Sequence, residues 1–332
     1  MNSKIKSPIG MLSMEFKKVF ITNKGIIIIA LLCIIQLFIL SKVDTSMEGT
    51  LLYYNNYMNV LEGPMTEKSE KYIEDEKGHF SNVKSEYEDK QQLYMAGKIS
   101  YSEMSIIEDR YVRDMIPYVA FKKVLKQQEH IKSMKDSKNQ DAWYVNDIGI
   151  NHLIYPEEIY SEKLSWLFML LTMIVLVVTC VAYEEHTGMD KLSNVTLLGR
   201  KELFKDKLVV CGVIVLSTFA ISNLSFLLLA LKSYKFSGTI APANSLRTFS
   251  YLGELPIWVL LLAIYLMKFL VMILAAVLTI IIAKKVSGII KKIAIAMTII
   301  IVPLLIWMIV SGGNKVEHNT PIDYYEMIDL EI

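Results

Sequence analysis

Cysteine is scarce in this chain, and its placement argues against a disulfide framework or a metal cluster. Only three cysteines occur among 332 residues, and Cys33, Cys180 and Cys211 all lie inside apolar stretches. Disulfide scaffolds and zinc sites need cysteines in larger numbers or at close spacing. We therefore interpret the three thiols as small packing residues.

Charge is also scarce, and neither sign dominates. Charged residues make up 21% of the chain, below the roughly 25% that is typical of soluble domains. The 35 Lys and Arg residues nearly cancel the 34 Asp and Glu residues, so the balance indicates no nucleic-acid partner. Hydrophobic residues reach 53% and the mean hydropathy is +0.38. The apolar residues are concentrated in five blocks, and this concentration excludes an ordinary cytosolic enzyme.

The sequence also lacks the motifs of common catalytic sites. It contains no G-x-x-x-x-G-K-[ST] nucleotide-binding loop and no G-x-S-x-G nucleophile motif. The histidines lack the close spacing of metal ligands; they are His79, His130, His152, His186 and His318. We expect no catalytic residue, no metal and no cofactor in this polypeptide, so we expect that it is not an enzyme by itself.

Long apolar stretches are what the sequence has in abundance. A helix needs about 20 apolar residues, with roughly 17 to 25 acceptable, to cross the hydrocarbon core of a membrane. The stretches are continuous rather than alternating, which favours helices over barrel strands. They are residues 25–41, 164–183, 208–231, 257–283 and 293–310. The sequence thus predicts an all-α, multi-pass protein of the cell membrane with five transmembrane helices, the first of them uncleaved.

Lysine and arginine in the connecting segments predict the orientation, because they concentrate on the cytoplasmic side. They are frequent in residues 1–24, 184–207 and 284–292, and sparse in residues 232–256 and 311–332. The N-terminal segment and the two other basic segments are therefore predicted to be cytoplasmic. The large domain 42–163, the loop 232–256 and the tail 311–332 are predicted to be extracellular.

The large domain 42–163 has the pattern of a helical hairpin. Apolar residues at helical spacing follow Thr66, and Ala96-Gly97-Lys98 then interrupts the pattern. Ser100 and Glu103 form a capping box that begins a second helix, which extends to about Lys138. We interpret the apolar stripes as the contact between the two helices. The alternative is that part of them binds a ligand or a partner.

The segment 184–207 is the most informative part of the sequence. Two acidic residues at the end of the second span precede a short amphipathic segment, and a basic run leads into the third span. The apolar residues at helical spacing are Met189, Leu192, Val195 and Leu198. Such a segment can lie along the membrane and present an apolar ridge to a soluble partner.

These features resemble the permease subunits of the ABC-2 type export family. Six residues fit the family's pattern between the second and third spans: Glu185, Gly188, Leu192, Thr196, Arg200 and Lys207. Residues 15–20, within the segment 1–24, are similar to the family's amphipathic helix ahead of the first span. The family usually has six spans with both termini inside, whereas five stretches are found here.

The resemblance implies a transmembrane subunit of an ATP-driven exporter. Its partners would be two copies of an ABC ATP-binding subunit and a second permease, the same or homologous, in the lipid bilayer. The external hairpin suggests that the exporter moves or clears a peptide or a lipid-like antibiotic. The alternative is a membrane-anchored sensor or assembly factor that recognises an external ligand through residues 42–163 and has no transport path.

Two groups of candidate site residues near the segment 184–207 follow from this interpretation. The contact for the ATP-binding subunit is predicted to comprise Gly188, Met189, Leu192, Val195 and Thr196. Glu184 or Glu185 is predicted to pair with Arg200 and to brace the base of the second and third spans.

Polar residues inside the spans favour a transport path over a pure anchor. The candidates are Ser222, Asn223 and Lys268. Counted from Ile257, Lys268 lies near mid-membrane and would face a subunit interface, where it would attract an anionic group of the cargo. In the alternative, residues 257–267 lie in or above the outer interface and the span begins near Lys268.

Overall fold

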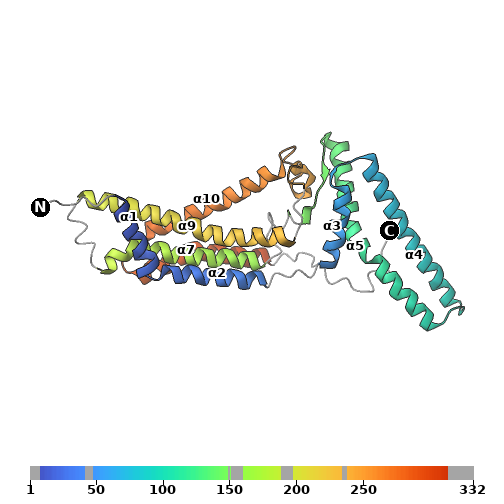
Figure 1. Cartoon of the computed structure of the whole chain (residues 1–332), viewed down its shortest axis with the longest axis horizontal. Helices are drawn as coiled ribbons and strands as arrows, with labels where there is room; N and C mark the ends of the chain where they lie inside the picture. The colour runs from blue at the N-terminus through green and yellow to red at the C-terminus, as the bar shows by residue number, and fades with distance from the viewer. Residues whose placement is uncertain are drawn as a thin grey trace. The chain divides into compact units, whose positions relative to one another are not determined.

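The computed structural model describes residues 8–41, 48–148, 150, 160–187, 197–233 and 238–312. Within these ranges the chain is almost entirely helical, and it divides into two compact units (Figure 1). The first unit takes its described residues from Met1–Val43, His152–Lys232 and Ala263–Lys315. The second takes them from Asp44–Asn151 and Ser233–Leu262. The all-α prediction is confirmed for the described part of the chain.

The first unit is built from the apolar helices. They are α2 (Gly25–Ser41), α7 (Tyr160–Thr187), α9 (Leu197–Ser233), the part of α10 (Ile257–Lys285) from Ala263 onward, and α11 (Ile289–Gly312), preceded by α1 (Pro8–Phe16) and the π-helical turn η1 (Lys17–Thr22). Among the described residues, four helices are long and apolar enough to cross a membrane. The bent pair Leu12–Thr22 and Gly25–Ser41 would supply a fifth. Each predicted apolar stretch therefore falls on a helix.

Helix α7 forms the centre of the first unit. It packs against both α2 and α11, and Met169, Met173 and Val177 are fully buried along it. The helix continues past its apolar stretch to Thr187, and α9 begins at Leu197, ahead of its own apolar stretch. Residues 184–187 and 197–207 of the predicted loop 184–207 are therefore helical. Charged side chains such as Glu184 and Lys207 can lie on helices here because they pair with each other across the two helices. Residues 188–196 lie outside the described part.

A sharp bend separates η1 from α2. The two helical segments meet at 59°, and Lys24 between them has a left-handed backbone with φ of +56°. Gly25 is required at this point, since a Cβ there would lie 2.6 Å from the carbonyl oxygen of Val19. Real Cβ atoms do not approach a backbone oxygen so closely, so the bend depends on the missing side chain.

The second unit has three main helices around an aromatic core. They are α3 (Glu48–Leu61), α4 (Glu67–Met95) and α5 (Tyr101–Lys138), and α5 packs against both of the others. A two-residue antiparallel pairing joins β1 (Gly63–Pro64) to β2 (Trp143–Tyr144). Phe80 of α4 contacts Tyr118 and Phe121 of α5, with ring centroids 5.1 and 5.4 Å apart.

Local capping signals set the boundaries of the hairpin formed by α4 and α5. Thr66 accepts a hydrogen bond from the N–H of Ser69 at the start of α4, and Ser100 accepts one from the N–H of Glu103 at the start of α5. In both cases the later side chain bonds back to the N–H of the cap residue. The helix starts and the break at 96–98 are those that the sequence predicts.

Residues 238–256 pack with the second unit. They include the short 3-10 turns η3 (Ala243–Ser245) and η4 (Arg247–Phe249). His130 donates from Nε2 to the carbonyl of Asn244 at 2.8 Å, and Ser245 accepts a bond from the Trp143 N–H at 2.8 Å. The segment that the sequence suggests as a separate loop therefore shares contacts with α5 and β2.

Candidate functional site

Charged side chains gather at one end of the apolar helices. We call the charged cluster the set that comes from α1, η1, α7, α9 and α11: Glu15, Lys18, Glu184, Glu185, Lys207 and Lys292. Four of them, Glu15, Glu184, Lys207 and Lys292, are buried. Buried charges are costly unless each has an opposite partner, so the pairing within the cluster matters.

Glu184 is the centre of one half of the cluster. Its Oε2 accepts a hydrogen bond from Lys207 Nζ at 2.9 Å, and its Oε1 lies 3.6 Å from Lys18 Nζ. Lys18 also pairs with Glu15, three residues earlier. Two acids and two bases therefore balance, and one carboxylate joins η1, α7 and α9. Lys207 additionally donates to the carbonyl of Val181 at 3.3 Å, which fixes its side chain along α7.

Glu185 forms the other half of the cluster with α11. It pairs with Lys292, whose side chain is only 2% exposed, while the Glu185 side chain is 42% exposed. The N–H of Gly288 donates to Glu185 Oε1 at 3.2 Å, just before α11 begins. Adjacent acids on α7 therefore reach different partners, one toward α9 and one toward α11. Displacement of the end of α7 would be transmitted to both helices.

A second polar contact, the polar trio, lies away from the charged cluster along the same helices. It consists of Gln36 on α2, Ser165 on α7 and Ser222 on α9, all buried. Gln36 Nε2 donates to Ser222 Oγ at 3.0 Å, and Ser165 Oγ donates to Gln36 Oε1 at 2.8 Å. An amide side chain with both ends bonded is well suited to an apolar interior. The polar trio and the charged cluster thus connect α7 and α9 at two levels along the length of the helices.

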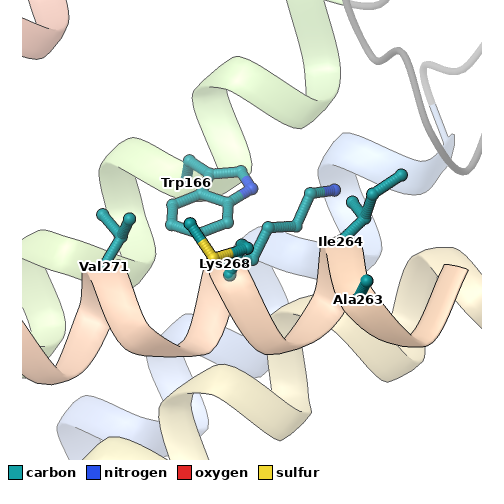
Figure 2. Close-up of a pocket in the computed structure, with 6 residues that line it drawn as sticks. Trp166, Ala263, Ile264, Lys268 and Val271 are labelled. Atoms are coloured by element: carbon teal, nitrogen blue, oxygen red, sulfur yellow. The ribbon is translucent and has the colours of Figure 1, made fainter. Parts of the chain in front are cut away.

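The predicted transport-path residues have different surroundings. Ser222 is 3% exposed and belongs to the polar trio. Asn223 bonds within its own helix, donating from Nδ2 to the carbonyl of Phe219 at 2.9 Å. Lys268 lies in a groove between α7 and α10, with its ammonium 5.2 Å from the centre of the Tyr265 ring (Figure 2). The structure does not bring these three residues together into one site.

The predicted contact for an ATP-binding subunit lies outside the described residues. This applies to Gly188, Met189, Leu192, Val195 and Thr196. Arg200 lies on α9, and its side chain is also outside the described set. The pairing of Glu184 or Glu185 with Arg200 stays a prediction, and the described ion-pair partners of these two acids are lysines.

Several residues of the site are not singled out by the sequence. In the sequence, three lysines of the charged cluster appear only as basic residues of connecting segments or as part of the family pattern: Lys18, Lys207 and Lys292. No local pattern indicates which acid each of them pairs with. Gln36 carries a usable signal, since it is the only amide within the apolar stretch 25–41. A polar residue inside a span is a functional candidate by default. Ser165 gives no such signal near the end of its stretch.

The described residues were compared with the arrangements of known metal sites, and the chain with known proteins. Within the described ranges, no group of three or more His, Cys, Asp or Glu residues is arranged to hold a metal ion. The thiol of Cys180 on α7 donates to the carbonyl of Lys207 on α9 at 3.9 Å, and Cys211 is buried on the same helix four residues later. Comparison of the chain with protein-family models, curated proteins and solved structures finds no match. The ion pairs and hydrogen bonds described above connect α7 with η1, α9 and α11.

Proposed function

We propose that this chain is a permease subunit of an ATP-driven ABC-2 type exporter. In this proposal two ATP-binding subunits engage residues 187–198 from the cytoplasm, and a second permease completes the transport path. The cargo class is a peptide or a lipid-like antibiotic that meets the external helices. The resemblance of residues 185–207 to the family's coupling segment motivates the proposal.

The charged cluster is the observation that carries this proposal. Residues 188–196 connect α7 to α9 in sequence, and the pair of Glu184 and Lys207 joins the two helices three residues before the end of α7 and ten residues after the start of α9. A force applied to the connection would act on Glu184 and Lys207 together. Because Glu184 also contacts Lys18 and its neighbour Glu185 contacts Lys292, the force would reach η1 and α11 as well. A simple anchor has no need of such connections.

Copurification tests the proposed partner. The full chain, affinity-tagged and extracted in mild detergent from its native host, should bring down an ABC ATP-binding subunit. Leu192→Asp combined with Val195→Asp should abolish this association, because it places two charges on the apolar ridge. Membrane insertion and expression level should not change.

A matched control introduces the same two charges elsewhere. Met95→Asp and Ile106→Asp change apolar side chains that are 72% and 68% exposed in the hairpin, and they should leave copurification intact. Unchanged association in the Leu192 and Val195 variant would refute the assigned contact. If no ATP-binding subunit copurifies with the parent chain, the sensor or assembly factor becomes the better interpretation.

A further inference from the structure

None of the described residues of α10 belongs to the charged cluster, but a cation–π contact attaches this helix to the same end of the apolar helices. The Lys284 ammonium lies 3.3 Å from the centre of the Phe204 ring. Lys284 is in the last turn of α10, and Phe204 lies seven residues after the start of α9. A ring attracts an ammonium group that lies within about 6 Å of its centre. The end of α10 is therefore held against the start of α9.

A second contact joins the same two helices farther along their length. The rings of Phe219 and Phe269 meet edge to face, with their centroids 5.1 Å apart. Phe219 follows Phe204 by fifteen residues on α9, and Phe269 precedes Lys284 by fifteen residues on α10. Fifteen residues of helix extend about 22 Å, or about four turns. Such equal spacing is expected of an antiparallel helix pair that keeps one register over this length.

Between these two contacts, one face of α10 is packed into the core of the first unit. Its buried residues there are Met272, Ala275, Ala276, Thr279, Ile282 and Ala283. They recur every three or four residues, which is the spacing of one helix face. Residues 261–271, all of which the structure describes, include none that is buried. The two contacts therefore lie at the two ends of the packed stretch of α10.

One turn near the start of α9 contacts two neighbouring helices. Lys207 follows Phe204 by three residues, so the two side chains are neighbours on the surface of the helix. Lys207 pairs with Glu184 of α7 at 2.9 Å, and Phe204 contacts Lys284 of α10. A displacement of the start of α9 would therefore act on α7 and α10 together.

We propose that Phe204 and Lys284 form a latch that holds the end of α10 to α9, so that the two helices move as one body. The contact between Phe219 and Phe269 keeps the register at the other end of the packed stretch. The latch adds α10 to the helices that the charged cluster connects. It does not depend on the presence of an ATP-binding partner.

The body formed by α9 and α10 carries two of the candidate transport-path residues. Asn223 lies four residues after Phe219 and donates to its carbonyl at 2.9 Å. Lys268 directly precedes Phe269. A displacement at the start of α9 would therefore reach both residues through the latched pair. This consequence rests on the proposed function, because it requires a partner that acts on the connection 188–196.

Distance measurements between spin labels test the latch in the full chain. Labels at Val209→Cys on α9 and Ile281→Cys on α10, which replace side chains that are 50% and 44% exposed, report the separation of the two helices. Serine replaces the three native cysteines in this background. Lys284→Met should raise the ratio of displaced to latched population about two- to fivefold, which corresponds to loss of a contact of about 0.5 to 1 kcal/mol. Phe204→Leu should do the same, because it keeps apolar bulk but removes the ring.

Conservative variants separate the cation–π contact from general packing. Phe204→Trp and Lys284→Arg keep a ring and a cation, so each should retain the distance distribution of the parent. Lys284→Met combined with Phe204→Leu should have no larger effect than either change alone. Lys291→Met, which removes an exposed lysine of α11, is the matched control and should leave the distribution unchanged.

A second pair of labels, at Ile21→Cys and Ile281→Cys, tests the consequence for transport in the complex with the ATP-binding subunit. A non-hydrolysable ATP analogue should change the distance between η1 and α10 in the parent, and Lys284→Met should reduce that change. An equal change in both proteins would show that α10 does not depend on the latch to follow α9.

Three results with the first pair of labels would overturn the latch. A parent-like distribution in Lys284→Met shows that the ammonium does not hold the helices together. A parent-like distribution in Phe204→Leu assigns the contact to apolar bulk rather than to the ring. Additive effects in the combined variant show that the two residues act independently. Because these measurements use the chain without a partner, absence of a copurifying ATP-binding subunit would refute the proposed function and leave the latch to be decided by them.

Discussion

Glu184 on α7 pairs with lysines of two other helical segments, η1 and α9. Its two carboxylate oxygens face different lysines, Lys207 at 2.9 Å and Lys18 at 3.6 Å. Since Lys207 is 6% exposed, it depends on this carboxylate for compensation of its charge. The pair is therefore sensitive to loss of either partner alone.

A double-mutant cycle on Glu184 and Lys207 measures this dependence. Glu184→Gln should destabilise the first unit by roughly 3 to 5 kcal/mol, as is usual when one partner of a buried pair is removed. The combination with Lys207→Met should recover most of that loss, because no unpaired ammonium remains. Thermal unfolding in detergent, followed by a thiol-reactive dye that reports the buried Cys180 and Cys211, gives the energies. Additive losses in the cycle would show that the two residues act independently.

In the second unit, Asp147 accepts a hydrogen bond from the hydroxyl of the fully buried Tyr54. Burial raises the pKa of the Asp147 carboxyl, against the opposing effects of the Tyr54 bond and the nearby Lys123. The folded state therefore holds the proton more tightly than the unfolded chain does. The stabilisation is complete below the unfolded pKa of about 3.9 and is lost as the pH rises through the higher folded value.

Asp147→Asn should remove this pH dependence, because the amide does not titrate and can still accept from Tyr54. The stability of the variant relative to the parent should be greatest at pH 7 and should shrink toward pH 4. Each unit by which folding raises the pKa of Asp147 adds about 1.4 kcal/mol to the difference in stability that develops between pH 4 and pH 7. Hydrogen exchange of peptides from α3 and α5 in the full chain, measured at each pH, gives this difference in stability between variant and parent. Asp141→Asn, an exposed neighbour, should give no such trend.

At the scale of elements, the bend between η1 and α2 determines where Lys18 lies. Gly25→Ala would introduce a Cβ 2.6 Å from the Val19 carbonyl, so the bend must open or shift. Spin labels at Met14 and Ile34, both exposed, should report a changed distance distribution in a background with serine at the native cysteines. Gly212→Ala is the control, since a Cβ at that position would meet nothing within 4 Å and only a neutral or stabilising effect is expected.

The contact between α7 and α9 can be tested by oxidation. Cys180 and Cys211 are buried, and the Cys180 thiol lies 3.9 Å from the carbonyl oxygen of Lys207, about one turn before Cys211, so copper phenanthroline should form a disulfide between the two thiols as it takes up two electrons. Peptide mapping should find the 180–211 linkage and no linkage to Cys33. Cys211→Ser should abolish the product. Persistent absence of the linkage in the parent chain, with the reagent shown to be active in the membrane, would contradict this helix pairing.

For the molecule as a whole, the sequence predicted those features that depend on local patterns. The apolar stretches identify the helices that are long and apolar enough to cross a membrane, because hydrophobicity is a property of the segment itself. Thr66 and Ser100 identify helix starts because capping acts over three residues. Helix α3 was not predicted, since its Asn- and Tyr-rich sequence has modest helix propensity. Burial of Tyr54 and Met58 against the other helices stabilises it.

The contacts of the charged cluster could not be predicted in this way. Glu185 and Lys292 are 107 residues apart, and Gln36 and Ser222 are 186 apart. Many lysines in the basic segments are equally plausible partners by sequence alone. Only the packing of α7 against α2 and α11 selects among them, and that selection depends on side-chain shape over the whole unit.

The distance in sequence between Glu185 and Lys292 has a consequence for biogenesis. During synthesis α7 is made long before α11, so the surface of α7 that packs against α11 and the carboxylate of Glu185 have no partner there until α11 is translated. Lys207 arrives 23 residues after Glu184, whereas Lys292 follows Glu185 by 107. The bundle is therefore closed by its last described helix, and a nascent chain stalled before α11 exposes an incomplete surface to insertases and membrane proteases.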